Sequence, residues 1–144
     1  MNDNSQQNHS TGPCGDLCEA DRKAALDIFG KLLMEVRDNT IRHWDRICAD
    51  KTKYAPWDRL TRKFPDLDER TREIIGNALP HIVDYYIYRL LAGIDANEAV
   101  RVSVITEAIT VTNIARVSWG LPAEPAGDDG WLQRFSKERF EQPY

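Results

Sequence analysis

The feature that most constrains this chain is a long run of apolar residues spaced three and four apart in its first third. That spacing places side chains on one face of an α-helix. It predicts a helix from Asp16 or Asp21 to Ala49, with acidic residues near the positive end of its dipole. The expected apolar stripe consists of Leu26, Phe29, Leu33, Val36, Thr40, Trp44 and Ile47.

A second long helix is expected over residues 66–92. Asp66 is a plausible N-cap with Glu69 three residues later, and Gly93 is expected to end the helix. Pro80 lies inside this segment, where we expect a kink and not a break. The fold class is therefore mainly α, with two long antiparallel helices. The apolar positions of the second helix are Ile74, Ile75, Ala78, Leu79, Ile82, Val83, Tyr86, Leu90 and Leu91.

The segment 99–114 has two interpretations. Val100, Val102 and Val104 alternate with polar residues, which favours a small β-hairpin. The alternative is a third helix over residues 97–119, since this stretch contains no proline or glycine. The β-branched residues lead us to prefer the hairpin. Glycines and prolines then predict a loop over 120–130, followed by a C-terminal segment that docks on the helices through Trp131, Leu132 and Phe135.

The domain organisation follows from composition. Residues 1–15 contain few apolar groups and are expected to form a disordered tail, whereas residues 16–144 are expected to form one helical domain. No apolar run approaches the roughly 20 residues that span a bilayer, and no signal peptide is evident, so we expect a cytoplasmic protein without membrane contact. The net charge of −4 argues against a dedicated nucleic-acid binder.

The three cysteines, Cys14, Cys18 and Cys48, are expected to be reduced thiols because their number is odd and the core does not need disulfides. Cys14 and Cys18 could hold a metal with His9 or His43. Zinc motifs, however, usually contain two spaced ligand pairs. We therefore predict no metal site and no cofactor.

The best catalytic-looking group is His81, Asp84 and Tyr88, which share one side of the second helix. A carboxylate can orient a histidine, and a tyrosine hydroxyl can donate to a developing anion. The alternative, which we favour, is that the three residues form the solvated edge of an amphipathic helix. No familiar catalytic motif occurs elsewhere, so an enzyme is the less favoured class.

Charged residues on the first helix include Arg37, Asp38 and Arg42, a pattern typical of a solvated face. Such a face can also clamp a carboxylate or phosphate of a partner. His43 and Thr40 lie near the apolar stripe, where a buried hydrogen-bonded pair is expected.

The segment 51–64 is the most basic stretch and mixes lysines and arginines with Tyr54, Trp57 and Phe64. This mixture can follow a phosphate backbone and stack bases, so nucleic-acid contact is one interpretation. The other is a connecting loop whose aromatic residues cover the helix ends.

Three segments carry a resemblance to a family. Residues Ser118–Glu124 and Gly127–Lys137 resemble the C-terminal part of a small group of uncharacterised bacterial proteins, and Val36–Ile47 is similar to their first helix. Trp119 and Pro122 depart from that pattern. The resemblance implies a bacterial origin and carries no activity or binding residues with it.

The function that fits these patterns best is a non-catalytic module, of accessory or immunity type, that binds another protein. Trp57, Trp119 and Trp131 are candidate interface anchors, with Arg59 beside them, although tryptophans in loops also pin those loops to the core. The first alternative is an enzyme or small-ligand binder that uses His81, Asp84 and Tyr88. A homodimer formed through the first helix is compatible with the binding function.

Overall fold

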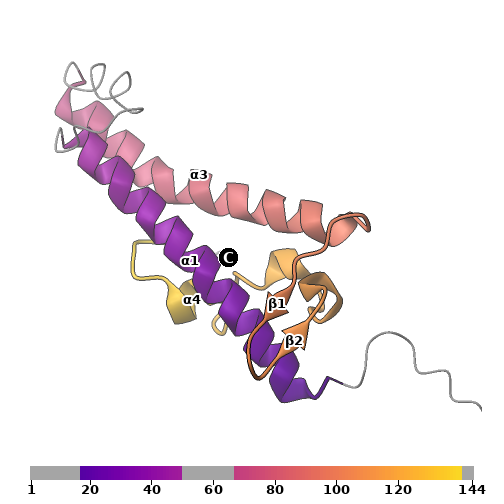
Figure 1. Ribbon diagram of the computed structural model, residues 1–144. Helices are drawn as coiled ribbons and strands as arrows, with labels where there is room; N and C mark the ends of the chain where they lie inside the picture. The colour runs from indigo at the N-terminus through magenta and orange to yellow at the C-terminus, as the bar shows by residue number, and fades with distance from the viewer. Residues whose placement is uncertain (1–16, 50–66, 141–144) are drawn as a thin grey trace, which may run out of the picture.

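The structure is a computed structural model that describes residues 17–49 and 67–140 (Figure 1). It confirms the mainly α class, with two long helices and a small antiparallel sheet. The elements, in chain order, are α1 (Glu19–Cys48), α3 (Glu69–Ala96), β1 (Val104–Ile105), β2 (Thr110–Val111), the 3₁₀ turns η1 (Ile114–Arg116) and η2 (Leu121–Ala123), and α4 (Trp131–Phe135).

Helix α1 agrees closely with the helix expected from Asp16 or Asp21 to Ala49. Its N-cap is Cys18, whose Sγ accepts a hydrogen bond from the backbone N–H of Asp21 at 3.4 Å. Glu19 and Asp21 lie in the first turn, where carboxylates stabilise the helix dipole. Ala49 is the C-cap.

Helix α3 has different ends from those predicted. Its N-cap is Asp68, which accepts hydrogen bonds from the N–H of Thr71 at 2.8 Å and from its hydroxyl at 3.0 Å. Asp66, the predicted cap, lies outside the described residues. The helix also continues past Gly93 to Ala96, because Ile94 packs against the core and so extends the helix by another turn.

Pro80 lies within α3 without breaking it. A proline at this position removes the N–H that would bond to the carbonyl of Gly76. In the structure, Nη2 of Arg139 donates to that carbonyl at 2.9 Å while the same guanidinium binds Asp45 at 2.8 and 2.9 Å. A C-terminal side chain thus satisfies the acceptor that the proline leaves open.

The two helices are antiparallel and lie close together at one end of the molecule (Figure 1). They spread apart toward the other end, where the hairpin and the 3₁₀ turns lie between them. The hairpin is confirmed, since Val104 pairs with Val111 and Ile105 with Thr110, so the alternative helix over 97–119 is wrong. Hydrogen bonds from Thr106 N–H to Ile109 and from Ile114 N–H to Val102 continue the pairing at both ends.

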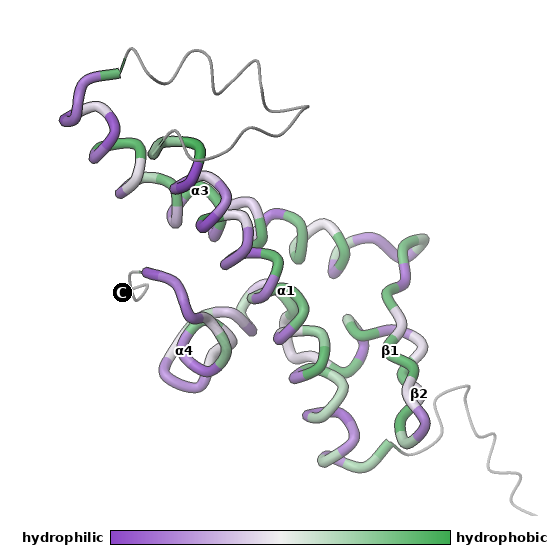
Figure 2. Tube along the Cα trace, turned by 60° about the vertical axis from the view of Figure 1, so that its left-hand side comes forward, coloured by the Kyte–Doolittle hydropathy of each residue, from purple (hydrophilic) through white to green (hydrophobic). Residues whose placement is uncertain are grey.

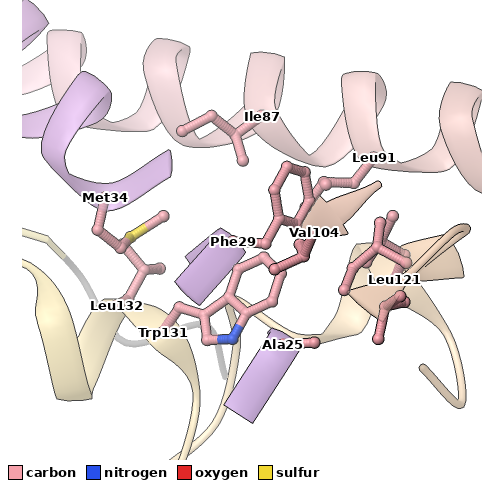
Figure 3. Close-up of a cluster of buried hydrophobic side chains, with 11 residues drawn as sticks. Ala25, Phe29, Met34, Ile87, Leu91, Val104, Leu121, Trp131 and Leu132 are labelled. Atoms are coloured by element: carbon pink, nitrogen blue, oxygen red, sulfur yellow. The ribbon is translucent and has the colours of Figure 1, made fainter. Parts of the chain in front are cut away.

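Trp131 lies at the centre of the core (Figure 3). It is 1% exposed and packs edge-to-face on Phe29, with ring centroids 5.9 Å apart. Gly30 lets the indole approach the backbone of α1, because a Cβ there would lie 2.6 Å from the ring. The expected docking of the C-terminal segment on the helices is therefore confirmed. The rest of the buried cluster is Ala25, Met34, Ile87, Leu91, Val104, Val111, Ile114, Leu121 and Leu132.

The predicted apolar stripe of α1 is partly wrong. Phe29 and Ile47 are buried as expected, but Val36 is 55% exposed and Met34 and Ile41 are buried in its place. Trp131 packs on this inner face over Gly30, one turn before Met34. Hydrophobic residues recur along both long helices (Figure 2), yet no helix in the described ranges is long and apolar enough to cross a membrane.

Candidate functional site

Arg37 is a fully buried arginine between α1, α3 and the C-terminal segment, with 0% of its side chain exposed. Its Nε and Nη2 bind the two carboxylate oxygens of Asp84 in a bidentate pair. Its Nη1 donates to Asp38 at 3.1 Å and to the Ser136 hydroxyl at 3.0 Å, and Nη2 also donates to the carbonyl of Arg139 at 2.9 Å. The five N–H groups of the guanidinium therefore all have acceptors.

Asp38 completes this network. One oxygen accepts from the Ser136 hydroxyl at 2.8 Å, and the other accepts from the backbone N–H of Lys137 at 2.6 Å. The prediction that Arg37 and Asp38 form a solvated charged face is wrong, since both are buried. Arg42, on the same helix, is half-exposed and pairs with Glu138 at 3.5 Å.

The electrostatics of Arg37 favour a permanent charge. Burial lowers the pKa of its guanidinium, but the hydrogen bonds and negative charges of Asp84 and Asp38 outweigh this effect and raise the pKa above its ordinary value. A charged group that is fully hydrogen-bonded in this way fixes the position of its neighbours. The network joins α1, α3 and residues 136–139.

Of the three residues proposed as a catalytic group, Asp84 and Tyr88 line one cavity and His81 does not. Asp84 faces α1, where both of its carboxylate oxygens are bound to Arg37. His81 is exposed on α3, and Tyr88 is about half-exposed. The carboxylate that would orient His81 is thus bound by a buried cation from another helix.

An apolar cavity of about 210 Å³ lies beside Asp84. Tyr85 and Tyr88 of α3 form one wall, and Pro122 and Pro125 lie opposite them. Its remaining lining residues are Met34, Ile87, Ala126 and Leu132. Two of the three proposed catalytic residues, Asp84 and Tyr88, therefore line a cavity whose other walls are almost entirely apolar.

Trp119 stands on the surface and lines two other recesses. Its side chain is fully exposed, at 101% of the reference area. It lines a shallow recess of about 450 Å³ with Ala123 and Ala126, and Ala126 also lines the apolar cavity. The recess and the cavity share Ala126, and together they are here called the 119–126 surface, which comprises Trp119, Pro122, Ala123, Pro125 and Ala126 with Tyr85 and Tyr88.

The other predicted binding residues lie elsewhere. Trp131 is a core residue and is not accessible to a partner, so of its two interpretations the core anchor is correct. Trp57, Arg59 and the basic segment 51–64 lie outside the described residues, as do the 1–15 tail and Cys14.

Cys18 and Cys48 are free thiols at opposite ends of α1. Burial raises the pKa of the Cys48 thiol, and the nearby charge of Asp45 adds to this rise. Within residues 17–49 and 67–140, no three His, Cys, Asp or Glu side chains are placed so that they could hold a metal ion.

Comparison of the chain with protein-family models, with curated proteins and with solved structures gave no match. The resemblance of residues 36–47, 118–124 and 127–137 to a bacterial family therefore stays a prediction. The candidate site rests on geometry alone.

Sequence reasoning missed the Arg37 network. Its signal was present, since Gly30, Met34, Arg37 and Ile41 are spaced four, three and four apart on the buried face of α1. Local spacing alone predicts that a charged residue such as Arg37 faces solvent. The partners of Arg37, which are Asp84 and Ser136, lie 47 and 99 residues away. Nothing in the local pattern indicated those partners.

Proposed function

We propose that this chain is a non-catalytic protein-binding module, of accessory or immunity type, that binds its partner through the 119–126 surface. The observation that carries the proposal is the complete exposure of Trp119 on a recess that shares Ala126 with an apolar cavity. Tryptophan and tyrosine side chains dominate the binding energy of protein interfaces, and they do so where a pocket receives an apolar group. Trp119, Tyr85 and Tyr88 fit that pattern.

The size of the cavity supports the uptake of a side chain. Small-molecule sites usually enclose about 300 to 1,000 Å³, whereas this cavity encloses about 210 Å³. One leucine, phenylalanine or methionine side chain of a partner fits a space of that size. Trp119 would then pack against the partner next to that side chain and exclude water from the contact.

The rigidity of the surface also supports the proposal. Pro122 and Pro125 fix backbone angles, and the Ser118 hydroxyl donates to Glu124 at 2.7 Å and accepts from the N–H of Gly120 at 3.0 Å. Leu121, between Trp119 and the prolines, is anchored in the core. A preorganised surface loses little conformational entropy on binding.

The test is affinity capture with the tagged chain from a bacterial lysate, in parallel with the variants Trp119→Ala and Tyr85→Ala. The matched control is Ile105→Ala, which removes an apolar side chain of similar exposure from the hairpin. We expect one stoichiometric partner that is retained by the control and lost by both variants. Equal capture by Trp119→Ala and the control would refute the proposed surface.

A small-ligand binder is the second candidate, favoured by the position of Asp84 and Tyr88 in the cavity wall. A thermal-shift screen with small apolar fragments tests it. The expected result for this candidate is a rise in Tm that disappears in Tyr88→Ala and persists in Trp119→Ala. A fragment that stabilises all variants equally would bind elsewhere.

A further inference from the structure

Helix α3 carries apolar residues on two of its faces. Leu79, Ile87 and Leu91 point into the core and are buried. Ile74, Ile82, Tyr85 and Tyr86 are between 59% and 72% exposed. A surface helix normally has one apolar stripe and a polar opposite face, and apolar residues on both faces indicate that both are covered.

The exposed group forms one continuous patch. At about 100° per residue, Ile74, Ala78, Ile82, Tyr85 and Tyr86 lie within an arc of roughly 120° on the helix surface. We call this patch the α3 outer face. Most of it is turned away from Ile87 and Leu91, and thus away from α1 and η2, the elements that pack most closely on α3. Tyr85, near one edge of the face, also lines the apolar cavity with Pro122. In Figure 1 the described elements that pack along α3, namely α1, the hairpin and the 3₁₀ turns, lie on one side of it.

The area of the outer face is more than half of what a standard interface buries. Tyr85 and Tyr86 expose about 150 Å² each, and Ile74 and Ile82 expose roughly 100 Å² each, so the face offers on the order of 500 Å². A standard interface buries about 800 Å² on each partner. The aliphatic part of Arg89, one turn beyond Tyr85, adds further area.

We propose that the occupant of the α3 outer face is the same face of a second copy of this chain, so that the protein is an antiparallel homodimer about a twofold axis near Ile82. Such an interface is isologous and requires a self-complementary patch. Small Ala78 beside large Ile82 and Tyr86 lets two copies interlock closely. This dimer does not depend on the proposed role of Trp119, and Tyr85 is the one residue that belongs to both surfaces.

The charges along the edge of the patch specify the antiparallel direction. Arg70 lies near the start of α3 and Asp95 near its end, and both are exposed. An antiparallel pair centred at Ile82 places Arg70 of each copy beside Asp95 of the other. The two Arg89 side chains then lie about 20 Å apart along the helices, well beyond the screening length of about 8 Å. A parallel pair would bring like charges together.

The first test is sedimentation equilibrium of the full chain over a dilution series, with Ile82→Glu as the variant. Ile105→Glu is the control, because it places the same charge at an equally exposed isoleucine on the hairpin. We expect dimers for the wild type and Ile105→Glu, and monomers with unchanged helical circular dichroism for Ile82→Glu. A wild type that stays monomeric at the highest concentration would overturn the proposal, as would dimers of Ile82→Glu.

The second test addresses direction and uses only exposed charged residues, which avoids loss of folding. Arg70→Glu is expected to weaken the dimer severalfold, and the exchange Arg70→Glu with Asp95→Arg is expected to restore it. An exchange that leaves the dimer as weak as Arg70→Glu alone would exclude the antiparallel arrangement. The coupling between Arg70 and Asp95 is expected to vanish at high salt, because both side chains are exposed.

Discussion

At the scale of the residue, the buried Arg37 connects three parts of the described structure. All five N–H groups of its guanidinium donate hydrogen bonds, and the acceptors belong to α1, α3 and the C-terminal segment. Removing one member of a buried charge network leaves the remaining charges unpaired and desolvated. Asp38 would then keep its buried charge without its cation.

Arg37→Ala is expected to lower the free energy of unfolding by about 3–5 kcal/mol, because Asp38 and Asp84 lose their shared partner. Urea unfolding at neutral pH, followed by circular dichroism, measures the loss. Arg42→Ala is the matched control and is expected to cost at most about 1 kcal/mol, since its ion pair is half-exposed. Arg37→Lys keeps the charge without the planar fork and should fall between the two. Equal losses at positions 37 and 42 would contradict the assigned role of Arg37.

At the scale of the element, the two long helices could be predicted because their apolar residues repeat with the helical period over many turns. Their ends were less predictable, since Asp68 and Asp66 are equally good N-caps by residue type. The spacing of Gly30, Met34, Arg37 and Ile41 indicates the buried face of α1, but the contact of Trp131 with Gly30 comes from across the chain and is contained in no local pattern. The apolar cavity depends on Pro122 and Pro125 meeting Tyr85 and Tyr88, a contact that no local pattern contains.

Two helical glycines give opposite predictions. In Gly30→Ala the new methyl group would lie 2.6 Å from the Trp131 ring, so we expect a loss of about 1–3 kcal/mol from overpacking. Gly93→Ala meets no atom within 4 Å and removes backbone freedom from the unfolded chain, so a gain of about 0.5–1 kcal/mol is expected. Thermal unfolding of both variants tests the packing, and a destabilised Gly93→Ala would show that α3 does not continue to Ala96.

The start of α3 should make stability depend on pH. Hydrogen bonds from the N–H and the hydroxyl of Thr71 lower the pKa of the Asp68 carboxyl below its ordinary value. A carboxyl whose folded pKa is lowered stabilises the fold above its unfolded pKa, and this stabilisation is lost as the pH falls through the folded pKa. Asp68→Asn keeps an acceptor that does not titrate. The wild type should therefore have the higher Tm at neutral pH, and the two values should converge in acid; a constant difference would contradict the cap.

At the scale of the whole molecule, the C-terminal segment holds the two long helices together. Residues 136–139 supply a hydroxyl, a backbone N–H and a carbonyl to Arg37 and Asp38, and Arg139 bridges Asp45 and the carbonyl of Gly76. These contacts connect the chain across about a hundred residues. The stability of the helix pair should therefore depend on a segment that belongs to neither helix.

A chain that ends after Phe135 is expected to lose at least about 3 kcal/mol, because two hydrogen bonds to the Asp38 carboxylate disappear and each contributes roughly 1.5–3 kcal/mol. Urea unfolding of the shortened chain gives the value. Lys137→Ala is the control, since it keeps the backbone N–H that donates to Asp38, and it should unfold like the wild type. A shortened chain of unchanged stability would show that the segment contributes nothing to the helix pair.

The Arg37 network joins residues that are far apart in the sequence, and this separation limits when the network can form during synthesis. Arg37 precedes its acceptor at Arg139 by 102 residues, which at about 5–20 residues per second corresponds to roughly 5 to 20 seconds of synthesis. Throughout that interval the Asp38 carboxylate lacks its hydrogen bonds from Ser136 and Lys137. The Arg37 network of the newly made protein can therefore be completed only after synthesis has passed residue 139.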